Sequence, residues 1–530
     1  MEATLLHELA TVAAYREPDA LALTCGKHSV TYGDFAQSVA DVSAALVTLG
    51  LRRGGRVGVY LDKRVETVTA MFATAAAGGA FVPLNPILKP QQVSYIMRDC
   101  AAEFLVTSSD RLALLGDTLR VCNDLRHVLV IDDEGPSAPA TGYATHRWEH
   151  MRGGGASTHR VIDVDMAAIL YTSGSTGHPK GVVLSHRNLV AGAKSVASYL
   201  ENDARDTILA VLPLSFDAGF SQLTTAFHAG ARVVLLNYLL PKDVLTTLVR
   251  ERVTGLTAVP PLYLQLTQLS WPPGIDEHLR YFANTGGRMP LETLRTLQSR
   301  VPKSKPYLMY GLTEAFRSTY LPPEEVDRRP DSIGKAIPNA EILVLREDGT
   351  ECDDDEPGEL VHRGALVAMG YWNDAERTAE RYRPLRGRED ELVLPETAVF
   401  SGDVVRRDRD GFLYFIGRRD EMIKTSGYRV SPTEVEEVLY GTHLIGEAAA
   451  FGVPHPTLGQ GIVVVVTPKD GATLDHAALL GACRERLPAY MVPGRIEIRT
   501  GPLPRNPNGK IDRKELRPEF ESVFDVVGTA

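Results

Sequence analysis

A short loop crowded with glycine and hydroxyl residues surrounds one lysine in the stretch YTSGSTGHPKGVVLSH, residues 171–186. Glycine lets successive backbone N–H groups point at one centre, and the hydroxyls and the ammonium of Lys180 add donors and positive charge. This combination predicts a phosphate-binding loop, although a plain hairpin loop is the alternative for such a stretch taken alone. The Walker A loop is excluded because Gly181 follows the lysine, where that motif needs Ser or Thr.

Four further motifs carry residue types suited to nucleotide chemistry. They are YGLTE with Thr313 and Glu314, SGDVV with Asp403, GRRDEMIKTSG with Arg418 and Asp420, and PRNPNGKIDR with Lys510. A hydroxyl beside a carboxylate, as in the first of them, suits a metal–phosphate pair. Each motif taken alone has an ordinary structural explanation, such as a capped strand end, a turn or a solvated lysine. Their order along one chain is what makes them informative.

The elements that must position these motifs alternate along most of the chain. Apolar β-rich runs such as RVGVYL (56–61), AAILYTS (167–173) and ARVVLLN (231–237) are separated by helical patterns, which predicts α/β layers with parallel-rich sheets. Apolar runs with Asp-Gly turns predict antiparallel hairpins from about 335 to 415. A smaller α+β pattern follows Arg418–Asp420.

We therefore expect an α/β fold with two domains. A large N-terminal domain over 1–419 would hold parallel-rich αβ-layered sheets, the phosphate loop at 171–186 and a β-barrel-like subdomain at about 335–415. A small, mobile α+β domain would follow over 420–530. A chain of 530 residues is too long for one hydrophobic core, which agrees with this division.

Composition narrows the class of protein. A net charge of −10 gives no basic footprint for nucleic acid. The five cysteines are far apart with no CxxC pair, which predicts neither a disulfide framework nor a zinc site and fits a reducing compartment. The N-terminus lacks the basic region of a signal peptide, and glycines and prolines break the longest uncharged run, between Glu66 and Lys89. We expect a cytoplasmic protein without a membrane span.

The motifs together resemble the AMP-forming adenylating superfamily of acyl-CoA synthetases, peptide-synthetase adenylation domains and luciferases. They occur in the order found in that superfamily and cover essentially the whole chain. Longer runs, such as LPLSFDAGFSQLTTAF (212–227), are most similar to the AMP-forming acyl-CoA ligases associated with exosortase A systems. The resemblance implies that ATP activates a carboxylic acid as acyl-AMP with release of pyrophosphate. A thioester would then form on CoA or on a free-standing phosphopantetheinyl carrier protein.

The resemblance also implies roles for individual residues. Catalysis would fall to Lys510, Thr313 and Glu314, and Glu314 would hold Mg²⁺. The nucleotide would be bound by Thr172, Ser173, Gly174, Ser175, Thr176, Gly177, Lys180, Gly286, Gly287, Tyr310, Gly311, Thr313, Asp403, Arg418 and Lys510. Asp420 would be the pivot of the small domain, and Gly427 would line the approach of the thiol.

Five residues are candidates for binding the acid: Phe216, Asp217, Asn284, Gly311 and Arg317. In amino-acid-activating relatives an aspartate at the place of Asp217 faces the substrate ammonium, and Arg317 could bind a second carboxylate. The alternatives are a helix-capping aspartate and a structural ion pair, perhaps between Asp217 and Arg317 themselves. Both charged residues favour a polar acid, either an amino acid or a dicarboxylic acid.

Other functions fit parts of the same pattern. An adenylating enzyme could use its acyl-AMP for an amide or an oxidation instead of a thioester, or the acid could be a fatty or aryl acid. A non-catalytic nucleotide-binding regulator is a third possibility. The regulator is disfavoured because Lys180, Glu314 and Lys510 are all present. The sequence leaves open the acid, the thiol, the oligomeric state and the orientation of the small domain.

Overall fold

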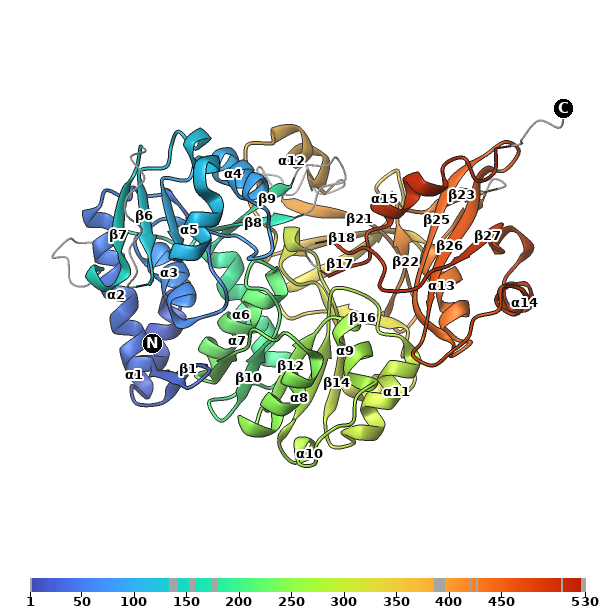
Figure 1. Cartoon of the computed structure of the whole chain (residues 1–530), viewed down its shortest axis with the longest axis horizontal. Coiled ribbons are helices and arrows are strands. Elements are labelled where there is room, and N and C mark those ends of the chain that lie inside the picture. Colours follow the sequence, from blue (N-terminus) through green and yellow to red (C-terminus); the bar gives the residue numbers. More distant parts are fainter. Residues whose placement is uncertain are drawn as a thin grey trace.

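The computed structural model describes most of the chain in continuous stretches. The described residues are 2–132, 142–151, 158–172, 179–385, 396–419, 421–425, 428–506 and 509–525. The N-terminal elements lie at the left of Figure 1 and the C-terminal elements at the right. Within the described residues the strands form three sheets.

The largest sheet joins parallel and antiparallel strands. Its order is β17 (Ala340–Leu345), β18 (Gly358–Gly364), β21 (Thr397–Arg407), β22 (Leu413–Arg418), β16 (Ser332–Ala336), β15 (Thr319–Leu321), β14 (Lys305–Tyr310), β13 (Tyr281–Asn284), β12 (Gly255–Ala258), β10 (Thr207–Ala210), β11 (Arg232–Leu235), β1 (Leu21–Cys25) and β2 (His28–Thr31), with β20 (Tyr382–Pro384) beside β21. In this order, each neighbouring pair from β14 to β1 is parallel. Each neighbouring pair from β17 to β14 is antiparallel, as is the pair of β1 with β2. The antiparallel pairs among β17, β18, β21 and β22 lie in the segment where hairpins are expected, about 335–415, and β15 extends the antiparallel part to earlier residues.

The second sheet carries the predicted phosphate loop. Its order is β19 (Gly370–Tyr371), β9 (Lys180–Ser185), β8 (Met166–Thr172), β4 (Ala80–Pro83), β3 (Arg56–Tyr60), β5 (Phe104–Thr107), β6 (His127–Val130) and β7 (Ala144–Arg147). Strands β8 and β9 are an antiparallel hairpin in which Thr172 pairs with Lys180, and β3 to β7 pair in parallel. The hairpin therefore holds the two ends of the loop together.

Helices cover and separate the sheets. In the N-terminal part they are α1 (Glu8–Arg16), α2 (Tyr32–Thr48), α3 (Val65–Ala76), α4 (Pro90–Asp99), α5 (Ser109–Leu115), α6 (His186–Tyr199), α7 (Asp217–Ala229), α8 (Pro241–Arg250), α9 (Pro260–Thr267), α10 (Ile275–His278), α11 (Leu291–Arg300) and α12 (Ala375–Arg381), with short 3₁₀ turns η1 (Gly116–Val121), η2 (Trp148–His150), η3 (Thr313–Ala315) and η4 (Pro323–Glu325). Helix α3 contacts β1 of the first sheet and both β3 and β8 of the second. It therefore lies between the two sheets.

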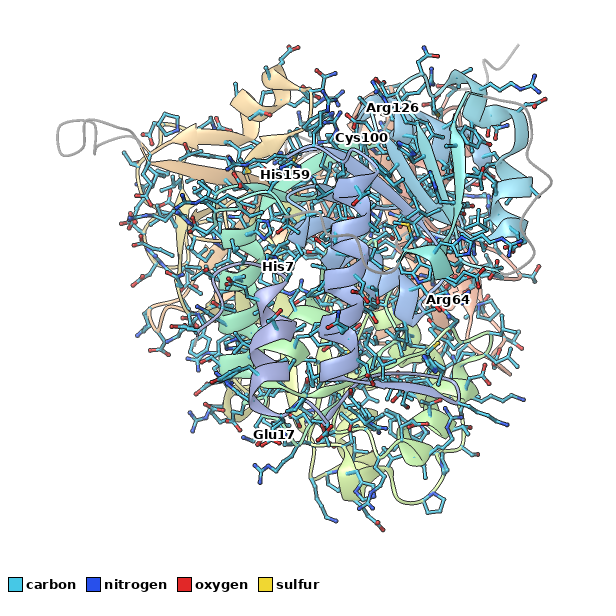
Figure 2. All side chains as sticks on the ribbon, turned by 90° about the vertical axis from the view of Figure 1, so that its left-hand side faces the viewer. His7, Glu17, Arg64, Cys100, Arg126 and His159 are labelled. Atoms are coloured by element: carbon cyan, nitrogen blue, oxygen red, sulfur yellow. The ribbon has the colours of Figure 1, made fainter. Side chains whose placement is uncertain are left out.

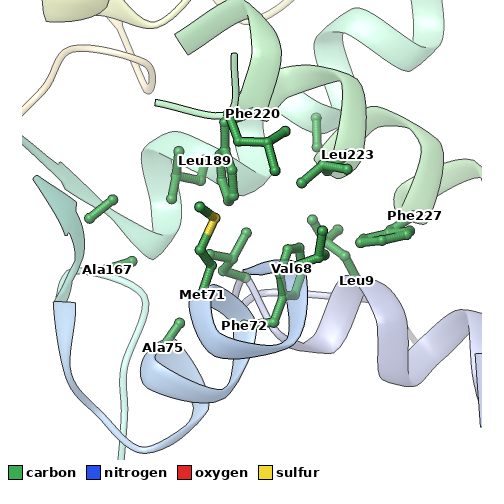
Figure 3. Close-up of a cluster of buried hydrophobic side chains, with 14 of the residues drawn as sticks. Leu9, Val68, Met71, Phe72, Ala75, Ala167, Leu189, Phe220, Leu223 and Phe227 are labelled. Atoms are coloured by element: carbon green, nitrogen blue, oxygen red, sulfur yellow. The ribbon is translucent and has the colours of Figure 1, made fainter. Parts of the chain in front are cut away.

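The main core forms where these inner helices meet. Met71 and Phe72 of α3 face Phe220 and Phe227 of α7 in Figure 3, and the rings of Phe72 and Phe227 meet edge to face at 5.2 Å. Leu189 of α6 joins the same cluster. This packing buries one side of α7 and so fixes the position of its first residue, Asp217.

The N-terminal helices close the core from outside. His7 and Glu17 flank the two ends of α1, which runs beside α2 on the face shown in Figure 2. Thr31 begins α2 as its N-cap, because its hydroxyl accepts a hydrogen bond from the backbone N–H of Asp34. No helix in the described stretches is both long and apolar enough to cross a membrane.

The C-terminal elements form a sheet of their own. It consists of β24 (Tyr428–Val430), β23 (Ile423–Thr425), β26 (Gly459–Pro468), β25 (Ile445–His455) and β27 (Arg495–Ile498), with α13 (Pro432–Tyr440), α14 (His476–Arg486), α15 (Arg513–Leu516), η5 (Ala489–Met491) and η6 (Arg517–Phe520). The run of β-branched residues in β26 is buried on both faces, as expected for a central strand. We refer to this unit as the C-terminal domain.

Candidate active site

Residues from both parts of the chain meet beyond strands β13 and β14. Asn284 ends β13 and Tyr310 ends its parallel neighbour β14, so the loops that follow lie together. The loop of Lys510 reaches the same place from the C-terminal domain. Its Cε lies 3.9 Å from the position that a Cβ on Gly286 would take, and the Phe216 ring lies 3.6 Å from that position. In this structure the C-terminal domain therefore has Lys510 turned toward the large domain.

The loop that carries Lys510 is held within its own domain. Asn506 Oδ1 accepts a hydrogen bond from the backbone N–H of Lys510 at 3.1 Å, and Arg505 pairs with Glu447 of β25. The Lys510 side chain is exposed in part and desolvated in part by the neighbouring protein. This partial desolvation, with the neighbouring guanidinium of Arg418, lowers the pKa of Lys510.

Two buried carboxylates lie within electrostatic range of the Lys510 ammonium. They are Asp403 on β21 and Asp217 at the start of α7. Burial raises the pKa of each carboxyl group, and the charge of Lys510 acts against that rise in both cases. One neighbouring carboxylate of Lys510, that of Asp403, belongs to the antiparallel strands. The other, that of Asp217, belongs to a candidate for binding the acid.

Asp403 is held with one acceptor position open. The Tyr310 hydroxyl donates to Oδ2 at 2.5 Å, and the Ser401 hydroxyl accepts from the Asp403 backbone N–H. The Nε of Arg418 lies 3.7 Å from Oδ1. Among the described residues, Oδ1 is buried without a hydrogen-bond partner. An oriented carboxylate with a free buried oxygen is suited to accept hydrogen bonds from the hydroxyls of a ribose.

Glu314 and Lys180 meet at Tyr371 of β19. The Tyr371 hydroxyl donates to Glu314 Oε1 at 2.6 Å, and its ring faces the Lys180 ammonium at 4.7 Å. Desolvation lowers the pKa of Lys180, and the guanidiniums of Arg381 and Arg377 on α12 lower it further. Three cations near one carboxylate form a positively charged surface that suits a polyphosphate bound with a metal ion.

The metal-binding capacity of this surface rests on one carboxylate. In the part of the chain that the structure describes, no three His, Cys, Asp or Glu side chains converge on one point. Mg²⁺ commonly uses one or two carboxylates together with substrate phosphates and water. Glu314, oriented by Tyr371 and adjacent to the buried Thr313, fits such a site.

Part of the predicted site lies outside the described residues. This applies to Ser173, Gly174, Ser175, Thr176, Gly177, Asp420 and Gly427. Their flanking residues are placed: Thr172 and Lys180 form the last pair of the β8–β9 hairpin, and Arg418 ends β22. The roles of the seven residues stay predictions from the sequence.

The loops after β13 and β14 are shaped by their glycines. Gly286 has a φ of +76°, which few side chains tolerate, and a Cβ on Gly311 would lie 3.2 Å from the Cα of Arg317. Asn284 Nδ2 donates to the carbonyl of Gly287 at 2.8 Å, and among the residues that can be described its Oδ1 is buried without a partner. The lack of a Cβ at Gly311 thus lets the backbone of Arg317 lie close to the loop that follows β14.

Asp217 and Arg317 form a buried ion pair. Arg317 Nη1 lies 3.5 Å from Asp217 Oδ2, and the two side chains are 3% and 4% exposed. A contact of 3.5 Å is long for a charge-assisted hydrogen bond, which is usually below 3 Å. Asp217 Oδ1 accepts from the backbone N–H of the next residue, Ala218, and the N-cap position of α7 belongs to Phe216, not to Asp217. Of the alternatives raised by the sequence, the structure has the ion pair.

Two interactions fix the segment before α7. A Cβ on Gly219 would lie 1.9 Å from the carbonyl oxygen of Pro213, so only glycine allows the helix this close to the preceding loop. The buried ammonium of Lys63 donates to the carbonyl of Val211 at 2.7 Å, and burial lowers the pKa of Lys63 to about 7. Both interactions hold the chain just before Asp217.

Sequence reasoning missed Tyr371, Arg381 and Lys63. Tyr371 and the two arginines of α12 lie outside the five motifs, in stretches whose residue types do not by themselves point to phosphate. Lys63 is one basic residue in the short stretch LDKRVE, where a solvated side chain is the ordinary expectation. Only the folded contacts reveal these three residues.

Comparison with protein families gives two matches. The AMP-binding enzyme family matches residues 10–372, and the AMP-binding enzyme C-terminal domain matches residues 434–510. The first match alone spans more than half of the 530 residues.

Individual proteins are similar over almost the full length. An L-proline–[L-prolyl-carrier protein] ligase of Streptomyces coelicolor is 33% identical, with 93% of this chain and 92% of that protein covered. A long-chain-fatty-acid–CoA ligase of Salmonella typhimurium is 28% identical, with 90% and 87% covered. The crystal structure of ATP-bound MatB from Rhodopseudomonas palustris superposes with a TM-score of 0.85 at 25% identity, covering 98% of this chain and 100% of that one.

Proposed function

The chain belongs to the AMP-binding enzyme family and is an AMP-forming acid–thiol ligase, and we propose that its acid is a small polar acid with an amino group. Such a ligase uses ATP to turn a carboxylic acid into an acyl-AMP and then transfers the acyl group to a thiol. The single observation that carries the choice of acid is the buried carboxylate of Asp217 within electrostatic range of Lys510.

The nucleotide would lie across the residues described above. Asp403 would accept hydrogen bonds from the ribose hydroxyls through Oδ1, with its carboxylate fixed by Tyr310. Lys180 and the loop from Thr172 to Gly177 would bind the pyrophosphate end, with Gly286, Gly287 and Gly311 along the nucleoside. Mg²⁺ held by Glu314 would neutralise charge on the phosphates, beside the hydroxyl of Thr313.

In the first step a carboxylate oxygen attacks the α-phosphorus of ATP. The new O–P bond forms as the bond to the bridging oxygen breaks, and pyrophosphate leaves with the bonding electrons. The two anionic groups repel each other, so the main task is to neutralise and position them. The Lys510 ammonium would do this between the acid and the α-phosphate, consistent with its electrostatic interaction with both Asp217 and Asp403.

In the second step a thiol sulfur attacks the acyl carbon. The C–S bond forms as AMP leaves with the electrons of the C–O bond. Lys510 would occupy the path of the thiol, so the C-terminal domain would turn away about Asp420 and bring Gly427 to the thiol. The solvent-accessible ion pairs Arg288–Glu437 (2.9 Å) and Glu292–Lys469 (3.2 Å) join the domains. Such pairs contribute only about 0–1 kcal/mol each, which favours a domain that can turn.

An α-amino group would lie where Asp217 can bind it. An α-amino group is separated by one carbon from the carboxylate that Lys510 would contact. Asp217 is within electrostatic range of the Lys510 ammonium. The long contact to Arg317 leaves Asp217 able to accept a shorter, stronger bond from a substrate ammonium. An alkyl chain would offer the buried Asp217 carboxylate no hydrogen-bond donor, which disfavours a fatty acid.

ATP–pyrophosphate exchange over three groups of acids tests this proposal. Amino acids, dicarboxylic acids and fatty acids are each offered with ATP and Mg²⁺, and mass spectrometry identifies the thioester formed with CoA or with a separate carrier protein. We expect exchange with amino acids. Exchange with dicarboxylic acids alone would assign the recognition of the acid to Arg317 instead, and exchange with fatty acids alone would refute the polar acid.

Replacing Tyr371 by phenylalanine tests the positively charged surface. The variant loses the hydroxyl that donates to Glu314 while the ring under Lys180 stays. Partners that orient a metal-binding carboxylate typically affect metal affinity or activity by 10–100-fold, so we expect the KM for Mg-ATP to rise about tenfold. Steady-state exchange at varied Mg-ATP measures it.

Tyr382→Phe is the matched control for Tyr371→Phe. The Tyr382 ring packs edge to face on Tyr371 at 5.6 Å, but among the described residues its buried hydroxyl has no hydrogen-bond partner. Loss of the Tyr382 hydroxyl should leave the KM for Mg-ATP unchanged. An equal rise in both variants would mean that Tyr371 acts only through packing.

A further inference from the structure

Arg381, the last residue of α12, reaches across to strand β21. Its Nη1 donates to the carbonyl of Phe400 at 3.0 Å. A Cβ on Gly402 would collide with the same guanidinium, so the guanidinium lies directly against the backbone of Gly402. Gly402 immediately precedes Asp403, the residue expected to bind the ribose. Arg381 is thus placed beside the strand that carries the ribose-binding carboxylate.

The charge of Arg381 also acts on the surface around Glu314. Desolvation lowers the pKa of Lys180, and the guanidinium of Arg381 lowers it further. Burial raises the pKa of Asp403, and the charges of Arg418 and Arg381 oppose that rise. Arg381 therefore lies within electrostatic range of both the ribose-binding carboxylate and the lysine expected at the pyrophosphate end of ATP.

Arg381 differs from its neighbour on α12 in lacking a counter-charge. Arg377, one turn earlier, has its Nη1 3.1 Å from Asp374 Oδ2. Within the stretches that the structure describes, no aspartate or glutamate forms an ion pair with Arg381. The ammonium of Lys180 and the guanidinium of Arg381 repel each other, and Mg²⁺ on Glu314 would add to the positive charge. An anion among these groups would remove that repulsion.

A guanidinium is well suited to bind such an anion. It is planar and carries five N–H donors in a fixed fork, which matches two oxygens of one phosphate. The hydrogen bond to Phe400 uses one of these donors and fixes the position of the Arg381 side chain. Charge-assisted hydrogen bonds from arginine to phosphate are among the strongest that a protein makes.

We propose that Arg381 is a further phosphate-binding residue of the ligase, whose guanidinium contacts the β- and γ-phosphates of ATP together with Lys180. The inference rests on the proposed function, because it takes from there the place of the pyrophosphate end at Lys180. It does not depend on the identity of the acid. When the bond from the α-phosphorus to the bridging oxygen breaks, that oxygen keeps the bonding electrons. Arg381 then stabilises the negative charge on the departing pyrophosphate.

Binding of Mg-ATP and of AMP to the full-length enzyme, without any acid, tests this role. AMP keeps the adenosine and the α-phosphate but lacks the two phosphates that Arg381 would contact. In Arg381→Gln we expect the Kd for Mg-ATP, measured by isothermal titration calorimetry, to rise at least about tenfold, while the Kd for AMP stays within about twofold of the wild type. Arg381→Lys should give an intermediate Kd for Mg-ATP, because lysine keeps the charge but loses the fork.

Arg383→Gln is the matched control for Arg381→Gln. Arg383 lies two residues further on, in β20, and is exposed. Its guanidinium also packs on β21, 3.5 Å from the centre of the Phe400 ring, and its Nη2 lies 3.6 Å from Glu359 Oε2. Loss of the Arg383 charge should leave the Kd for Mg-ATP and the Kd for AMP unchanged.

The possible outcomes separate a phosphate contact from a structural role. Equal weakening of Mg-ATP and AMP in Arg381→Gln would overturn the inference and would mean that Arg381 only ties α12 to β21. An unchanged Kd for Mg-ATP would overturn it as well. Exchange with fatty acids alone would refute the polar acid and leave the binding result standing. A wild-type enzyme that binds Mg-ATP no more tightly than AMP would overturn the proposed place of the pyrophosphate end and, with it, this inference.

Discussion

Lys510→Ala is expected to lower acyl-AMP formation by about 10²- to 10³-fold while leaving thioester formation from a preformed acyl-AMP nearly unchanged. The ammonium of Lys510 lies within electrostatic range of both Asp217 and Asp403, the neighbours expected of a group that bridges acid and nucleotide. It is needed only while the carboxylate and the α-phosphate approach. Pyrophosphate exchange measures the first step, and release of AMP from added acyl-AMP and thiol measures the second.

The control for this variant is Lys514→Ala. Lys514 belongs to α15 of the same domain, four residues further along, and is exposed. It should leave both steps unchanged. Equal losses in both steps for Lys510→Ala would contradict the division of labour and would mean that Lys510 holds the C-terminal domain in place rather than acting on the first reaction.

Asp217→Asn is expected to lower kcat/KM for the preferred amino acid by roughly 10- to 100-fold. The substitution keeps the size of the side chain but removes the charge that would bind the substrate ammonium. It also leaves the guanidinium of Arg317, which is 3% exposed, without its counter-charge. Exchange kinetics measure the loss of activity, and thermal unfolding measures the accompanying loss of stability.

Asp206→Asn separates these two effects. Asp206 is 4% exposed and pairs with Arg280 at 2.7 Å in the same domain. This variant should lose stability without changing the kcat/KM ratio between an amino acid and its deaminated analogue. If both aspartate variants lowered activity in proportion to their loss of stability, Asp217 would be a structural residue only.

The fold was predictable because its strands are strongly patterned. The runs at β3, β8 and β11 are short, apolar and β-branched, and each appears as a strand within a residue or two of the predicted position. The change to Asp-Gly turns correctly marked the antiparallel strands β17, β18, β21 and β22. Local sequence determines these features, so no tertiary information was needed.

The acid-binding site was predictable only in part. The motifs located Asp217 and Arg317, but whether their side chains face a ligand or each other depends on a contact across 100 residues of sequence. Long-range packing creates such contacts, and no periodicity in one sequence reports them.

The most direct test of the proposed acid compares an amino acid with the same acid lacking its amino group. Exchange kcat/KM is measured for the best amino acid and for its deaminated analogue, with the wild-type enzyme and with Asp217→Asn. We expect the wild type to prefer the amino acid by at least roughly 100-fold and the variant to lose most of that preference. Equal use of both acids by the wild type, or a preference that survives in Asp217→Asn, would contradict recognition of an ammonium by Asp217.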